Sequence, residues 1–153
     1  MAGYSNQKVF ILYEDEHLLV VKKPFGMESQ RGKSFAMDQE SLLRGYLSSK
    51  TKTDNPYLAV VHRLDRPVAG VMVYAKTKKA AADLSAQLQT ENFSKKYEAV
   101  VSGIVPACEG RLEGYLTADK RTGTTSVSSK ADPLAKKAVL TWKEIARERS
   151  EIR

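Results

Sequence analysis

The feature that most constrains the fold of this chain is a pair of short apolar runs separated by a polar stretch. The runs Leu58–Val61 and Val71–Ala75 flank His62–Gly70. Short runs rich in β-branched residues and bounded by Pro and Gly are typical of strands. Gly70 allows a tight backbone where the second run begins. The sequence therefore predicts a loop at a strand end, where folds commonly place functional residues.

The charges within this loop suggest chemistry. Asp65 lies between Arg63 and Arg66. Nearby positive charge favours the ionised form of a carboxylate, and guanidinium groups bind phosphates bidentately. The loop thus combines a candidate nucleophile or base, Asp65, with arginines that can bind anions. The alternative at this stage is a purely structural Arg–Asp–Arg ion pair.

The remaining pattern predicts an α+β fold. Further strands are expected over Val9–Tyr13, Leu18–Lys22, Ser94–Gly103, Gly110–Leu116 and Lys136–Ile145. Helices are expected over Gln39–Ser49, capped by Asp38, and from Lys78 to about Thr90, capped by Thr77. Because strands outnumber helices and do not alternate regularly with them, we expect a mixed, mainly antiparallel sheet with flanking helices. Residues 1–8 are expected to be flexible, and residues 9–153 to form one domain.

Several side chains outside the central loop are also candidates. The segment Lys22–Met27 is interrupted by Pro and Gly and predicts a loop after the second strand. Tyr97 offers a flat ring suited to stacking on a base, although a tyrosine in a strand more often packs in the core or on a sheet surface. Thr117–Asp132 is predicted to be a mobile loop, in which Lys120, Arg121 and Lys130 could contact phosphates.

The composition points to a basic protein that binds a polyanion. The chain has 153 residues, with 25 Lys and Arg against 18 Asp and Glu, a formal net charge of +7. Nucleic acid is the first partner to consider and an anionic membrane surface the second. The polar N-terminus lacks a secretory signal, so a cytoplasmic location is expected. The single cysteine, Cys108, cannot form an internal disulfide. With two histidines and no ligand cluster, no metal is expected.

The block His62–Arg66 resembles the catalytic signature of the RluA-type RNA pseudouridine synthases, a His-Arg-Leu-Asp-Arg motif. The segment Lys22–Met27 is similar to a family motif in which a strand runs into a Lys-Pro-x-Gly loop near the active site. A third family motif, Lys-x-Tyr-x-Ala-x-Val-x-Gly, is matched by Lys95 or Lys96 and by the residues Tyr97, Ala99, Val101 and Gly103.

The resemblance implies a cofactor-free isomerase that converts uridines of rRNA or tRNA to pseudouridine. Its fold would have a central basic cleft. Asp65 would be the catalytic residue, and Arg63 would fill the space left by a flipped nucleotide. Arg66 would hold Asp65 charged or grip phosphate, and Tyr97 would stack on the base. The other candidate RNA contacts are Lys22, Lys23 and His62.

The chain departs from the family pattern in two ways. Ala69 stands where many members have serine, and the C-terminal Gly-Arg-x-His-Gln-Ile-Arg motif is absent. A chain that lacks the C-terminal part of the catalytic domain is therefore expected. The main alternative function is a catalytically silent RNA-binding module. An aspartate-dependent hydrolase is disfavoured because glycosidases pair two carboxylates, and no second acid stands out beside Asp65.

Overall fold

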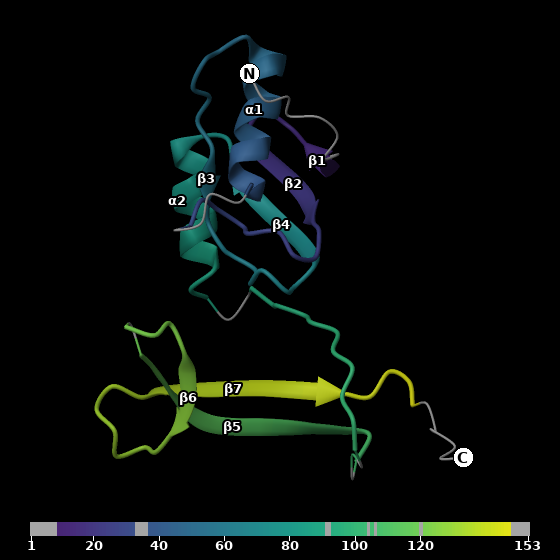
Figure 1. Cartoon of the computed structure of the whole chain (residues 1–153), viewed down its shortest axis with the longest axis vertical. Coiled ribbons are helices and arrows are strands. Elements are labelled where there is room, and N and C mark those ends of the chain that lie inside the picture. Colours follow the sequence, from purple (N-terminus) through teal and green to yellow (C-terminus); the bar gives the residue numbers. More distant parts are fainter. Residues whose placement is uncertain are drawn as a thin grey trace. The chain divides into compact units, whose positions relative to one another are not determined.

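The computed structural model describes residues 9–32, 37–90, 93–103, 105, 107–119 and 121–147. The chain divides into two compact units, Met1–Tyr97 and Glu98–Arg153. The predicted α+β class is confirmed, because both units contain an antiparallel sheet and the first also carries two helices (Figure 1). The segment 1–8, which we expected to be flexible, lies outside the described residues.

The first unit is built on a four-stranded antiparallel sheet. Its strands are β1 (Phe10–Glu14), β2 (Leu18–Lys23), β3 (Ala59–Val60) and β4 (Gly70–Ala75), in the order β1-β2-β4-β3. In the central pair, Leu18 of β2 lies opposite Ala75 of β4, and Lys23 lies opposite Gly70. The end of β2 and the start of β4 therefore meet at one end of the sheet. The loop that follows β2 and the loop that precedes β4 therefore lie side by side where they join the sheet.

Helix α1 (Gln39–Thr51) begins where the sequence predicts. The Asp38 carboxylate accepts hydrogen bonds from the Ser41 backbone N–H at 2.9 Å and from the Ser41 hydroxyl at 2.7 Å, which satisfies a free donor of the first turn. Leu43 and Leu47 of α1 are fully buried. They pack with the inward side chains of the sheet in one core cluster, whose buried members are Leu19, Val21, Leu43, Leu47, Leu58, Met72 and Tyr74.

Helix α2 (Lys78–Gln87) has the predicted Thr77 cap, whose hydroxyl accepts from the Ala80 N–H at 3.2 Å. The helix ends at Gln87, and hydrogen-bonded turns continue to Thr90. Ala81, Leu84 and Leu88 share one face of the helix and are half-buried. Helix α2 packs against β4 and β3. Because β3 has only two residues, it offers the helix little surface.

The second unit is a three-stranded antiparallel sheet with the order β6-β5-β7 (Figure 1). Its strands are β5 (Glu109–Ala118), β6 (Thr125–Ser128) and β7 (Lys136–Lys143). Gly110 of β5 lies opposite Trp142 of β7, and a Cβ atom at Gly110 would be 2.8 Å from the indole Nε1. Glycine is needed at this position because the indole ring occupies the space of a side chain.

Two predictions about the second half of the chain are wrong. No strand forms in the described residues 94–103, where Val100 and Val101 are exposed. The alternating residues favour an extended backbone, but a strand also needs a hydrogen-bonded neighbour. Conversely, the predicted mobile loop Thr117–Asp132 contains β6, because Thr125–Ser128 pairs with the end of β5. In this loop Arg121 and Lys130 are exposed, and Lys120 lies outside the described residues.

Candidate active site

Asp65 lines a pocket at the end of the first sheet where β2 ends and β4 begins. The pocket has a volume of about 260 Å³. Its walls come from the segment Arg63–Arg66 before β4 and from the segment Glu28–Gly32 after β2. Since Lys23 and Gly70 are paired, the sheet register itself brings these two segments together. The carboxylate is exposed and so is accessible to a ligand in the pocket.

Hydrogen bonds join the two loops on both sides of Asp65. On the C-terminal side, the Gly26 N–H donates to the Arg66 carbonyl at 2.9 Å, and the Arg66 Nε donates to the Gly26 carbonyl at 2.9 Å. On the N-terminal side, the Ser29 hydroxyl contacts both backbone polar groups of Leu64. Within the loop, the Val68 N–H donates to the Asp65 carbonyl at 2.9 Å and closes a turn. The backbone around Asp65 is therefore held by the loop that follows β2.

The Asp65 carboxylate forms no ion pair within the described part of the chain. The alternative of a structural Arg–Asp–Arg ion pair is thus not observed there, and the Arg66 Nε instead donates to the Gly26 carbonyl. Three arginines, Arg31, Arg63 and Arg66, contribute to the pocket wall together with the carboxylates of Asp65 and Glu28. This composition suits a ligand that carries a phosphate.

Lys23, the last residue of β2, is completely buried. Its ammonium group donates to the carbonyls of Met27 at 2.6 Å, Pro24 at 3.2 Å and Arg66 at 3.4 Å. Burial lowers the pKa of Lys23, while the nearby Asp65 charge acts in the opposite direction. Lys23 therefore ties the two loops together, because it donates to carbonyls of both. Lys22, the residue before Lys23 in β2, is exposed. Neighbouring side chains of a strand point to opposite faces of the sheet.

His62 has a structural hydrogen bond. Its Nε2 accepts from the Val73 backbone N–H at 3.0 Å, which ties the start of the loop to β4. Burial lowers the pKa of His62, and the charge of Lys95 lowers it further. A neutral imidazole that accepts at Nε2 carries its proton on Nδ1. With Nε2 engaged, only Nδ1 remains for an RNA contact, so RNA binding by His62 stays a prediction.

Tyr97 is not among the residues that line the pocket. The residue is 64% exposed and therefore accessible to a ligand. The stacking role expected for Tyr97 stays a prediction. Among the pocket-lining residues, sequence reasoning missed Glu28, Ser29, Gln30, Arg31 and Gly32. The only local signal was their position directly after the Lys-Pro-Phe-Gly segment at a strand end.

Comparison with known proteins identifies the family. The RNA pseudouridylate synthase family profile matches residues 17–152, nearly the whole chain. The chain belongs to the RNA pseudouridylate synthase family. The RluA type expected from the His62–Arg66 block is confirmed by similar curated proteins.

Three similar proteins show the range of the family resemblance. A ribosomal large subunit pseudouridine synthase D of Pseudomonas aeruginosa is 41% identical over 62% of this chain and 29% of its own length. A dual-specificity RNA pseudouridine synthase RluA of Vibrio vulnificus is 38% identical over 71% of this chain and 41% of its own length. An RNA pseudouridine synthase of Mycoplasma genitalium is 33% identical over 85% of this chain and 41% of its own length. The chain thus spans less than half the length of these relatives.

The fold agrees with this assignment. The structure of human RNA pseudouridylate synthase domain containing 4 matches with a TM-score of 0.64 over 85% of this chain and 51% of the human chain. At 24% sequence identity this match shows the fold. The described part of the chain contains no helix long and apolar enough to cross a membrane. It also contains no group of three or more His, Cys, Asp or Glu residues able to hold a metal ion.

Proposed function

We propose that this chain acts in the isomerisation of uridine to pseudouridine in RNA, with Asp65 as the catalytic residue. The observation that carries the proposal is the exposed Asp65 carboxylate in a pocket formed by two loops that both bear family motifs. The name of one relative, a ribosomal large subunit pseudouridine synthase, favours rRNA as the substrate, and tRNA is the alternative.

The reaction breaks the N1–C1′ bond of uridine, turns the base and joins C5 to C1′. Substrate and product have the same atoms and the same oxidation state, so the reaction needs no redox partner. It needs a carboxylate beside the ribose, and Asp65 would serve either by attacking C1′ or by removing a sugar proton. Lys23 is buried at the end of β2 and donates to the Arg66 carbonyl, which helps to hold the backbone next to Asp65.

The base must leave the RNA stack to reach Asp65. Flipping a nucleotide costs a few kcal/mol, which stacking and phosphate contacts offset. Arg63 lies next to Asp65 on the pocket wall and would fill the gap left in the RNA. Arg31 and Arg66 would bind the phosphates on either side, and Tyr97 would stack on the base.

The first test measures pseudouridine formation in total RNA from a strain that lacks the gene. The assay uses the wild-type 153-residue chain and its Asp65→Asn variant. Asp65→Asn should lower turnover at least about 10³-fold and leave the affinity for RNA unchanged, because the carboxylate acts on the ribose and not on phosphate.

Asp54→Asn is the matched control, since Asp54 is an exposed aspartate that lies outside the pocket. Turnover by the Asp65→Asn enzyme equal to that of the control would exclude Asp65 as the catalyst. If the wild-type protein binds RNA but forms no pseudouridine, the catalytically silent RNA-binding module is favoured instead.

A further inference from the structure

The Ser29 side chain makes an unusual double contact with the residue before Asp65. Its hydroxyl donates to the Leu64 carbonyl at 2.5 Å and accepts from the Leu64 N–H at 3.1 Å. Ser29 is 5% exposed, so water has little access to replace either bond. Both hydrogen bonds reach across 35 positions of sequence, from the loop after β2 to the loop before β4.

Only a side chain that both donates and accepts can make this pair of bonds at one residue. A hydroxyl has one donor and two acceptor lone pairs, whereas an alanine methyl group has neither. Replacement by alanine would leave the Leu64 N–H and carbonyl without these partners in a part-buried place, and the loop would have to move to satisfy them. The Ser29 hydroxyl therefore determines the position of the peptide groups on both sides of Leu64, including the one that leads to Asp65.

Ser29 is itself held in place by a hydrogen bond from a residue of the sheet. The Tyr74 hydroxyl donates to the Ser29 carbonyl at 3.1 Å, and Tyr74 is completely buried in β4. A chain of contacts thus runs from the core through Tyr74 and Ser29 to Leu64 and Asp65. On the other side of Asp65, the Arg66 carbonyl is held by the Gly26 N–H and by Lys23. Asp65 is the residue between these two anchored neighbours.

We propose that Ser29 is a positioning residue for the reaction: it fixes the Leu64 peptide groups so that the Asp65 carboxylate faces the pocket. This inference rests on the proposed function of Asp65. A catalytic group displaced by about 1 Å can lose about 100-fold in rate. The role of Ser29 therefore belongs to the chemical step and leaves RNA binding unchanged.

The experiment compares Ser29→Ala with the wild-type protein and with Ser49→Ala, which removes a serine hydroxyl from an exposed position of α1. Ser29→Ala should lower kcat by roughly 10- to 100-fold, with KM for RNA unchanged. Exchange of the Leu64 amide hydrogen, measured by NMR, should become faster, while the amides of α1 should keep their protection. Ser29→Thr retains the hydroxyl and should recover most of kcat.

A second variant covers the case in which Ser29→Ala does not fold. Tyr74→Phe removes only the hydroxyl that holds the Ser29 carbonyl, and it should lower kcat by a smaller factor and raise Leu64 exchange. A folded Ser29→Ala protein with the kcat of the wild type would overturn the inference. A loss of activity that is fully explained by the fraction of unfolded Ser29→Ala protein would also overturn it. If the wild type forms no pseudouridine, the proposed function fails, and an unchanged Leu64 exchange rate in Ser29→Ala would then independently overturn the positioning role.

Discussion

Two adjacent lysines show how neighbouring residues of the same type take different roles. Lys22 is exposed, whereas the ammonium group of Lys23 is buried against three carbonyl groups. The alternation of side chains along β2 places them on opposite faces of the sheet. Lys23 therefore serves as an internal cation that joins two loops, while the exposed Lys22 remains a candidate RNA contact.

This difference predicts unequal effects on stability. Lys23→Met should lower the free energy of unfolding by about 2–4 kcal/mol, because buried carbonyls lose a charged donor. Lys22→Met is the matched control and should change it by less than about 0.5 kcal/mol. Urea denaturation of both variants at neutral pH measures the difference. Equal losses in the two proteins would contradict the structural role of Lys23.

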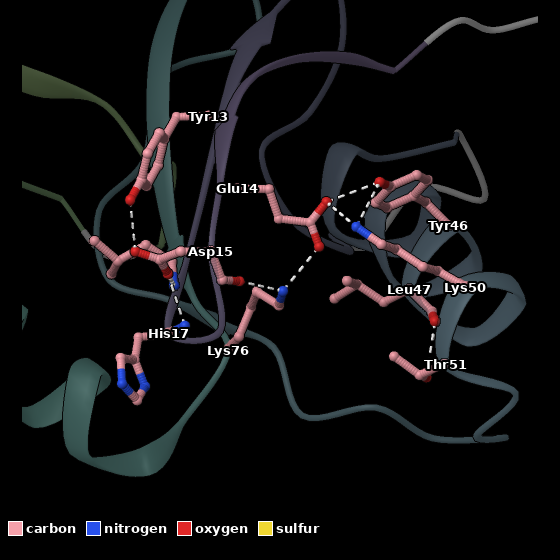
Figure 2. Close-up of polar contacts among 10 residues, drawn as sticks. Tyr13, Glu14, Asp15, His17, Tyr46, Leu47, Lys50, Thr51 and Lys76 are labelled. Carbon is pink, nitrogen blue, oxygen red and sulfur yellow. Dashed lines mark hydrogen bonds and ion pairs between the residues drawn. The ribbon is translucent and has the colours of Figure 1, made fainter.

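At the scale of elements, one buried carboxylate ties a strand to a helix and to the chain that leaves β4. Glu14, at the end of β1, accepts hydrogen bonds at 2.8 Å from Lys50 and Tyr46 of α1 and from Lys76 after β4 (Figure 2). Its side chain is 10% exposed. Burial alone would raise the pKa of Glu14, but these three donors outweigh burial and lower the pKa to about 2. The ionised form of Glu14 is therefore bound much more strongly than the protonated form.

The depressed pKa predicts a pH-dependent contribution to stability. A carboxylate with a lowered folded-state pKa stabilises the protein above its unfolded pKa of 4.5, and this stability is lost as the pH falls toward about 2. Glu14→Gln should therefore lower the free energy of unfolding by roughly 3 kcal/mol near pH 7 and by less than half of that at about pH 3. Glu16→Gln, at an exposed position of the same turn, is the control. If Glu14→Gln lowers the free energy of unfolding by the same amount at both pH values, the charge of Glu14 is excluded as the cause.

The elements that the sequence predicts correctly are those with local signals. Asp38 and Thr77 cap their helices as expected, because a capping side chain bonds to the backbone only three residues ahead. The segment Ser94–Gly103 had a strand-like pattern as well, but no partner pairs with its described residues. Pairing with β5 also made Thr125–Ser128 a strand within a segment whose polar composition suggested a loop. Strand formation depends on a distant neighbour, which a local pattern does not reveal.

At the scale of the whole molecule, the net charge of +7 predicts salt-sensitive binding to RNA. If about three phosphates are contacted, the affinity for a single-stranded RNA should fall roughly 20-fold between about 50 and 200 mM salt. Fluorescence titration of the same RNA at several salt concentrations measures the slope. Arg31→Met should make the slope shallower by about one contact, because we propose that Arg31 binds a phosphate. An affinity independent of salt would exclude electrostatic binding.

The sequence alone determined the family and the two helix caps, and it predicted that the loop carrying Asp65 is functional. These features follow from residue types at short spacing, so they can be predicted without knowledge of the fold. Only the tertiary structure decided that Lys23 and not Lys22 is buried, that Arg66 faces Gly26 instead of Asp65, and that Ser29 holds Leu64. The Ser29–Leu64 and Lys23–Arg66 contacts span 35 and 43 positions of sequence. Such partners meet only because the register of β2 and β4 places the two loops side by side.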